Sequence, residues 1–296
     1  MTNNFEPRKE SGGYRPRLST EEWKARKKAE KDTVYRMIDD TAEDIVKDPA
    51  KFAGYLDTQS RMDRYSATNA LLIYRQRPDA TQLKDFNDWA AEKVSIRKGE
   101  KSISILEPVE YTKSDGTAGV SFNVKKMFDI SQTNAAPNRA PAYNQDLRAV
   151  AAAMIDTAPV AVETLDELPY PGMGALYDNE QQKLYVRRNI GDSAALCQCL
   201  AQELSHAQLA AHGTQPYNRR DVGFQAVCIG YMLCSKYGID TRNFAINRIP
   251  ENWQQKEPKE IKSELTSMRT AMHEIHSRVS EQLYRKTLER AKEHER

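Results

Sequence analysis

The stretch Gln202-Glu203-Leu204-Ser205-His206 differs by one residue from His-Glu-x-x-His, the helical motif of zinc proteases. In that motif two histidines lie on one face of a helix and bind zinc, and the glutamate acts as general base on the metal-bound water. Here Gln202 stands at the first histidine position, and a neutral amide is a weak zinc ligand. The motif therefore predicts a helix that keeps Glu203 and His206 but binds zinc poorly.

The chain has 296 residues, more than one typical domain, and a formal charge of +2. That charge alone does not indicate nucleic acid, although residues 61–101 hold nine Lys and Arg against six Asp and Glu, an excess of three. We find no apolar run of about 18 residues and no hydrophobic leader in residues 1–31, so we expect a cytoplasmic protein without a membrane segment. Four cysteines in apolar stretches are expected to be buried thiols of a reducing compartment: Cys197, Cys199, Cys228 and Cys234.

The first 133 residues predict helices followed by strands. Ser19, with Glu22 three residues later, predicts a capping box that opens a helix to about residue 46. Further helices are expected after Asp48-Pro49, at 67–75 after Ser66 and after Thr81, and strands are expected at 95–97, 103–112 and 120–128. This pattern predicts an α+β domain at 19–133, preceded by a flexible segment at 1–18.

Residues 134–145 lack periodicity and predict a linker to a second α+β domain at 146–250. That domain is expected to hold helices at 145–156 and 221–237, the latter ended by Gly238. A hairpin at 174–187 and the helix that carries Gln202–His206 complete the prediction.

The tail at 258–296 predicts one long helix. Its apolar residues follow heptad-like spacings of four and three: Ile261, Leu265, Met268, Met272, Ile275 and Val279. They favour an amphipathic helix that lies on its own protein body, with a homodimer seam as the alternative. His273 and His276 on this helix are expected to face solvent.

Most of residues 30–250 resemble the ArdC antirestriction family of conjugative plasmids and integrative elements. The resemblance rests on Tyr65-Ser66, Asn69, Leu71-Leu72-Ile73-Tyr74, Arg77-Pro78-Asp79-Ala80-Thr81, Phe86, Trp89, Arg97-Lys98-Gly99-Glu100-Lys101, Pro108 and the run from Lys126 to Thr133. It implies an N-terminal domain that binds single-stranded DNA and a C-terminal domain with a zincin-type metallopeptidase fold. Aromatic rings that stack on bases and cations that meet phosphates are the side chains such binding needs. The expected DNA-binding residues are Arg61, Tyr65, Asn69, Tyr74, Arg75, Arg77, Trp89, Arg97, Lys98 and Lys101, although helical spacing also allows Trp89 to be a core residue.

The resemblance also places Gln225 where the family supplies a glutamate as third metal ligand, so two of three ligand positions hold amides. We therefore expect no bound metal, no cofactor and no catalytic residue, with Glu203 as the base if the chain is active after all. A metal-free interpretation has Glu203 and His206 hydrogen-bonded to each other and to the two glutamines.

Two alternative ligand sets exist. His212 follows His206 by six residues, the metzincin spacing, but Leu209 stands where that class needs glycine. Cys199 and Cys228 lie one turn from the two glutamines, yet Cys199 and His206 would be about 10 Å apart along a helix axis.

Three functions follow from the sequence. The first is a non-catalytic single-stranded DNA binding protein of a mobile genetic element, active in antirestriction or conjugation, with a pseudo-metallopeptidase domain. The second is a zinc peptidase with an atypical ligand set that uses Glu203. The third is an interaction module that acts through the zincin-like surface and the C-terminal helix.

Overall fold

Side-chain caps set the beginnings of the first three helices, as expected from the sequence. In the computed structural model, the Ser19 hydroxyl accepts from the Glu22 amide at 3.2 Å, and the Glu22 carboxylate accepts from the Ser19 amide at 2.8 Å. Asp48 and Ser66 cap the next two helices. The structure describes residues 19–113, 115–135, 146–170, 172–213, 216–244 and 246–294. The flexible segment expected at 1–18 and residues 136–145 of the expected linker lie outside this range.

The fold is α+β, as predicted. The N-terminal half contains α1 (Thr20–Ile45), α2 (Pro49–Arg61), α3 (Ala67–Gln76), β1 (Leu83–Lys84), α4 (Phe86–Ala91), β2 (Ile103–Thr112), β3 (Ala118–Asp129) and the short 3-10 helix η1 (Ile130–Gln132). The C-terminal half contains α5 (Leu147–Asp156), β4 (Ala161–Leu165), β5 (Ala175–Asp178), β6 (Lys183–Arg187), α6 (Ser193–His212), α7 (Gly223–Lys236), α8 (Glu251–Gln254) and α9 (Pro258–His294).

The segment after Thr81 differs from the prediction. The Thr81 amide donates to Asp129 at 2.7 Å, and this bond leads the chain into the short strand β1. The helix begins only at Phe86, because the Asp85 side chain accepts from the Asp88 amide at 2.9 Å and caps it. The strand expected at 95–97 is reduced to one bridge between Ile96 and Thr133.

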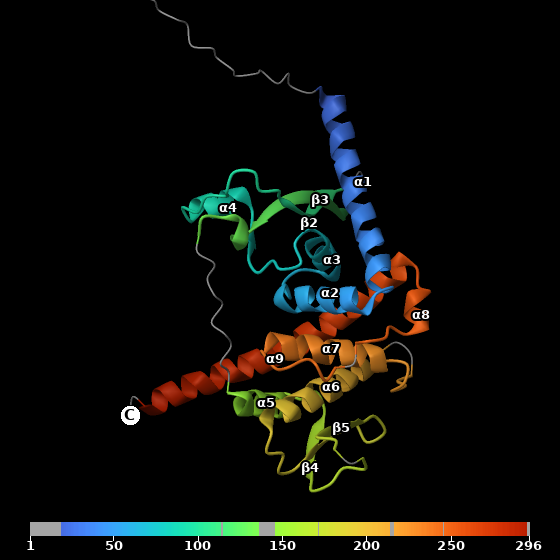
Figure 1. Ribbon diagram of the computed structural model, residues 1–296, viewed down its shortest axis with the longest axis vertical. Coiled ribbons are helices and arrows are strands. Elements are labelled where there is room, and N and C mark those ends of the chain that lie inside the picture. Colours follow the sequence, from blue (N-terminus) through green and yellow to red (C-terminus); the bar gives the residue numbers. More distant parts are fainter. Residues whose placement is uncertain are drawn as a thin grey trace, which may run out of the picture.

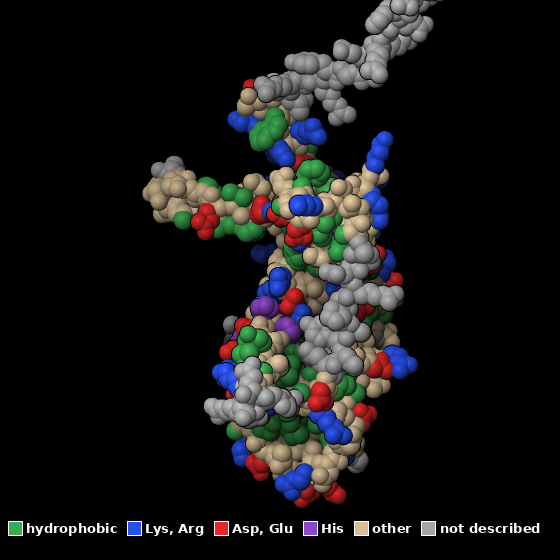
Figure 2. Space-filling model, turned by 90° about the vertical axis from the view of Figure 1, so that its left-hand side faces the viewer, with side chains coloured by type: hydrophobic (Ala, Val, Ile, Leu, Met, Phe, Trp, Pro, Cys, Tyr) green, Lys and Arg blue, Asp and Glu red, His purple; other side chains and the backbone are tan. Residues whose placement is uncertain are grey.

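The first sheet has the strand order β1-β3-β2, and all its pairs are antiparallel. β2 and β3 form a long hairpin whose register runs from Ile103 opposite Met127 to Thr112 opposite Ala118. Residues 103–106 of β2 are buried and residues 107–112 are exposed. The far half of the hairpin therefore projects from the body as an arm (Figure 2).

In the second sheet, the predicted hairpin is confirmed as β5 and β6, and Gly238 follows the end of α7 with a positive φ of 69°. The parallel strand β4 was not predicted. Its side chains are exposed or half-buried, so it lacks the alternation that identifies a strand from sequence.

Helix α9 crosses the molecule between the N-terminal helices and α5, α6 and α7 (Figure 1). Its six heptad-like residues are at most 1% exposed and belong to a continuous apolar core that reaches from α1 to α9. The interpretation of an amphipathic helix on its own body is confirmed, and these residues are not available as a dimer seam. The division into two domains stays a prediction.

One expectation for this helix is wrong. The His276 imidazole shares a hydrogen bond with the Tyr237 hydroxyl at 2.8 Å, and burial lowers its pKa to about 4, so it does not face solvent freely. None of the helices in the described part of the chain is long and apolar enough to cross a membrane.

Candidate nucleic-acid interface and candidate metal centre

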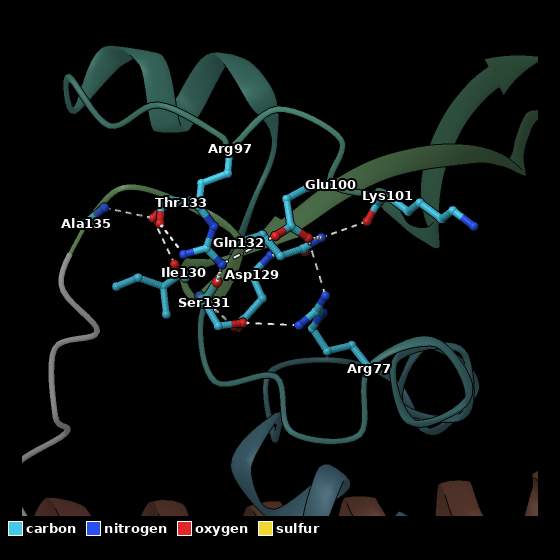
Figure 3. Close-up of polar contacts among 10 residues, drawn as sticks. All are labelled: Arg77, Arg97, Glu100, Lys101, Asp129, Ile130, Ser131, Gln132, Thr133 and Ala135. Atoms are coloured by element: carbon cyan, nitrogen blue, oxygen red, sulfur yellow. Dashed lines mark hydrogen bonds and ion pairs between the residues drawn. The ribbon is translucent and has the colours of Figure 1, made fainter.

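Two of the predicted DNA-binding arginines belong to a polar network around Glu100 (Figure 3). Arg77 and Arg97 form ion pairs with Glu100 at 3.5 and 3.3 Å, and both also donate to Ser131. Gln132 donates at 3.1 Å to Oε2 of the same carboxylate, the oxygen that also pairs with Arg77. These contacts fasten the turn at 97–101 to η1, so the two arginines have a structural role and their charge is partly neutralised.

The other predicted DNA-binding cations differ in their exposure and in their contacts. Arg61 donates to the backbone carbonyls of Pro78 and Ala80, which ties the end of α2 to the loop after α3. Arg75 is more than half exposed. Lys98 and Lys101 are exposed, and Figure 3 shows the Lys101 side chain pointing away from the network.

Two predicted contact residues are buried and need correction. Trp89 is 2% exposed and its indole N–H donates to the Phe128 carbonyl at 2.9 Å, so it is a core residue and offers no face to a base. The Asn69 amide bonds to the backbone of Leu106 twice, at 2.8 and 2.9 Å. Neither side chain is placed to contact DNA. Tyr65 and Tyr74 are half-buried and pack against core residues.

A different surface combines exposed rings with lysines. A groove of about 580 Å³ lies between α1 and the β2–β3 hairpin, and we name it the α1–hairpin groove. Its two aromatic rings are well exposed, Trp23 at 53% and Phe122 at 40%. The groove is lined by Trp23, Lys27, Lys28, Glu30, Lys31, Glu107, Phe122, Asn123, Val124 and Lys125.

Local periodicity explains this arrangement. Trp23, Lys27 and Lys31 are four residues apart, so they share one face of α1. On the hairpin, Phe122 and Val124 alternate with residues of the opposite face, and Val124 is paired with the buried Leu106. An apolar strip therefore runs from the core out along the arm, and exposed apolar patches of this kind mark interaction sites.

The groove is basic. Four lysines stand against two glutamates among its lining residues, an excess of two. Glu30 pairs with Lys27 at 3.2 Å and with Lys126 at 2.7 Å, while Lys125 pairs with Glu107 at 2.8 Å. Lys28 is exposed, and Lys31 donates to the hairpin residue Ser121 at 3.5 Å. This surface was not predicted from the sequence, although the four-residue spacing in α1 is a signal that indicates it.

At the candidate metal centre, Glu203 is held by protein groups. The Glu203 side chain on α6 is only 3% exposed, one oxygen accepts from the Tyr177 amide at 2.7 Å, and the other forms an ion pair with Arg219. Arg219 also donates to the Tyr177 carbonyl at 3.4 Å. The carboxylate is therefore held by one backbone hydrogen bond and one ion pair.

Two other side chains of the candidate centre, His206 and Gln225, also have protein partners. The Tyr217 hydroxyl shares a hydrogen bond with Nδ1 of His206 at 3.0 Å, and burial lowers the pKa of His206 to about 3, which keeps the imidazole neutral at pH 7. The Gln225 amide on α7 donates to Glu264 of α9, whose carboxylate also accepts from Lys256 at 2.8 Å. The predicted network among Glu203, His206 and the two glutamines is thus wrong in its partners.

The alternative ligand sets do not assemble either. His212 lies on the continuing helix α6 and faces Glu274 at 3.4 Å. Cys228 is fully buried, and burial raises the pKa of its thiol. Within the described residues, no three His, Cys, Asp or Glu side chains form a group that could hold a metal ion. The donor set, two amides beside one hydrogen-bonded histidine, does not fit zinc.

Comparisons with known proteins agree on one fold. Residues 25–143 match the model of the N-terminal domain of anti-restriction factor ArdC. Metal-free and Mn(II)-bound structures of the antirestriction ArdC protein from the R388 plasmid have 17% and 15% sequence identity to the chain, each with a TM-score of 0.51. They cover 73% and 74% of this chain and 86% and 85% of their own. No curated protein matches.

Proposed function

Because this chain is an ArdC-like protein with that family's N-terminal domain at residues 25–143, we propose that it binds single-stranded DNA and is not a peptidase. One observation carries the proposal: in the α1–hairpin groove, exposed Trp23 and Phe122 stand among lysines. Sequence-tolerant binding of single strands combines such stacking platforms with cations that follow the phosphates. A duplex keeps its bases stacked on each other, so we expect it to bind less tightly than a single strand.

The similar solved structures support a proposal for the role in the cell. The solved R388 protein carries the name antirestriction and comes from a plasmid, which supports a role on DNA of a mobile genetic element. We propose that the chain works in the cytoplasm, where it covers single-stranded DNA during conjugative transfer or against a restriction system. The ion pair between the buried Glu203 and Arg219 supports the non-catalytic part of this proposal.

The lysines of the groove give the first test. Replacing Lys28 and Lys31 by glutamine removes two cations that follow the phosphates, so we expect about tenfold weaker binding of a labelled oligothymidine. The slope of log K against log salt concentration should fall by about 1.4, since each phosphate contact of a single strand contributes about 0.7. The measurement is fluorescence anisotropy at several salt concentrations with a chelator present.

The matched control is Lys98→Gln with Lys101→Gln, which removes two exposed lysines of the surface that the sequence indicated. We expect less than a twofold change in affinity for this pair. If the control variant loses binding while the groove variant keeps it, the site lies at the turn at 97–101. If the unmodified protein binds neither the single strand nor the duplex, the proposed function is wrong.

A further inference from the structure

The candidate metal centre contains a cation of its own. Arg219 comes from the segment between α6 and α7, and its guanidinium reaches Glu203, whose side chain is only 3% exposed. A buried carboxylate needs a positive partner or hydrogen-bond donors to remain ionised. In a zinc protease the nearby metal ion supplies positive charge at the centre, whereas here the guanidinium supplies it.

Further hydrogen bonds connect Arg219 and Glu203 to Tyr177. Its guanidinium also donates to the Tyr177 carbonyl at 3.4 Å, and the amide of the same residue donates to Glu203 at 2.7 Å. Arg219, Glu203 and Tyr177 thus link the loop, α6 and β5 in one closed set of bonds. The neighbouring Tyr217 occupies Nδ1 of His206, and burial raises the pKa of this phenol to about 12, so it stays neutral.

At position 225, where the resemblance places a third metal ligand, the side chain also has a protein partner. Gln225 donates an amide hydrogen to Glu264, which also pairs with Lys256. A glutamate at 225 would place a second carboxylate against Glu264 and could not donate that bond. The amide is therefore the side chain that this contact requires.

We propose that Arg219 has replaced the metal ion as the positive charge of this centre, so that the Glu203–Arg219 ion pair holds the fold together and opposes metal binding. This ion pair lies in the C-terminal half of the chain, and its role does not depend on DNA binding in the groove. The centre is then a structural element whose positive charge comes from the Arg219 guanidinium.

Zinc binding tests the electrostatic part. Gln202→His with Gln225→Glu restores the expected ligands in the full chain, and a zinc indicator dye in competition reports the affinity. We expect adding Arg219→Gln to tighten zinc binding by about tenfold or more, because groups around the ligands change metal affinity 10–100-fold. Adding Arg220→Gln instead, at the exposed next residue, should leave it unchanged. Equal zinc affinity with and without Arg219 would overturn the proposal.

Thermal unfolding tests the structural part without metal. Arg219→Gln leaves Glu203 buried without its ion-pair partner, so we expect the unfolding midpoint to fall by about 3–6 °C. The double variant Glu203→Gln with Arg219→Gln removes the uncompensated charge and should recover at least half of that loss. A double variant no more stable than Arg219→Gln alone would overturn the proposal, even where the single variant folds poorly.

Discussion

Replacing Trp23 and Phe122 together by alanine is expected to weaken single-stranded DNA binding by about 30-fold or more. Stacking of one base on an aromatic ring contributes about 1–3 kcal/mol, and the double variant removes both exposed rings of the groove. Because these side chains are exposed and the two elements keep their lysines, the fold and the salt dependence of the residual binding should persist. Fluorescence anisotropy with labelled oligothymidine measures the loss.

Phe86→Ala is the matched control for this experiment. Its ring is 62% exposed on α4 and does not line the groove, so its removal should change affinity less than twofold. The unfolding midpoints of both variants should stay close to that of the unmodified protein. An unchanged affinity of the Trp23/Phe122 variant would mean that the rings do not stack on bases and that the groove serves another ligand.

The parts of the fold that depend on local chemistry could be predicted. The Ser19 capping box, the Asp48 and Ser66 caps and the heptad-like spacing of α9 all depend on residues a few positions apart. The beginning of α4 could not be predicted, because Asp129, nearly fifty residues later, accepts from the Thr81 amide and draws the segment into β1. A tertiary contact therefore determines where α4 begins.

The α1–hairpin groove could not be predicted from the sequence for a related reason. Trp23 and Phe122 are about a hundred residues apart, and only the packing of α1 on β3 brings them to one groove. The polar and aromatic residues between 61 and 101 predict a binding surface. In the structure, however, Arg77 and Arg97 form ion pairs with Glu100 and donate hydrogen bonds to Ser131. Sequence alone does not distinguish a cation that faces solvent from one that fastens a turn.

At the candidate metal centre, too, part of the arrangement could be predicted from the sequence and part could not. The weakness of Gln202 and Gln225 as ligands follows from their chemistry, which the sequence states directly. The partners of Glu203 and His206 do not, since Tyr217 and Arg219 lie in an irregular segment without periodicity. A buried carboxylate predicts that some cation or donor is present, and the fold identifies which one.

Asn69→Ala is expected to lower the free energy of unfolding by about 2–4 kcal/mol, although the sequence predicts Asn69 as a DNA-binding residue. β2 is an edge strand, and its outer edge faces α3. There the Asn69 amide satisfies both the N–H and the carbonyl of Leu106, while Gln76 does the same for Ser104. The alanine variant leaves two buried backbone groups of Leu106 without these bonds, and each unsatisfied group costs about 1–3 kcal/mol. Urea unfolding followed by circular dichroism measures the change.

The exposed Asn87 on α4 provides the matched control, and its replacement by alanine should stay within about 0.5 kcal/mol. Per folded molecule, Asn69→Ala should bind oligothymidine within twofold of the unmodified protein, because the Asn69 amide is buried and is held by both backbone groups of Leu106. The opposite pattern, full stability with lost DNA binding, would return Asn69 to the binding surface. It would also mean that α3 does not protect this edge, and β2 would then be open to pairing with another strand.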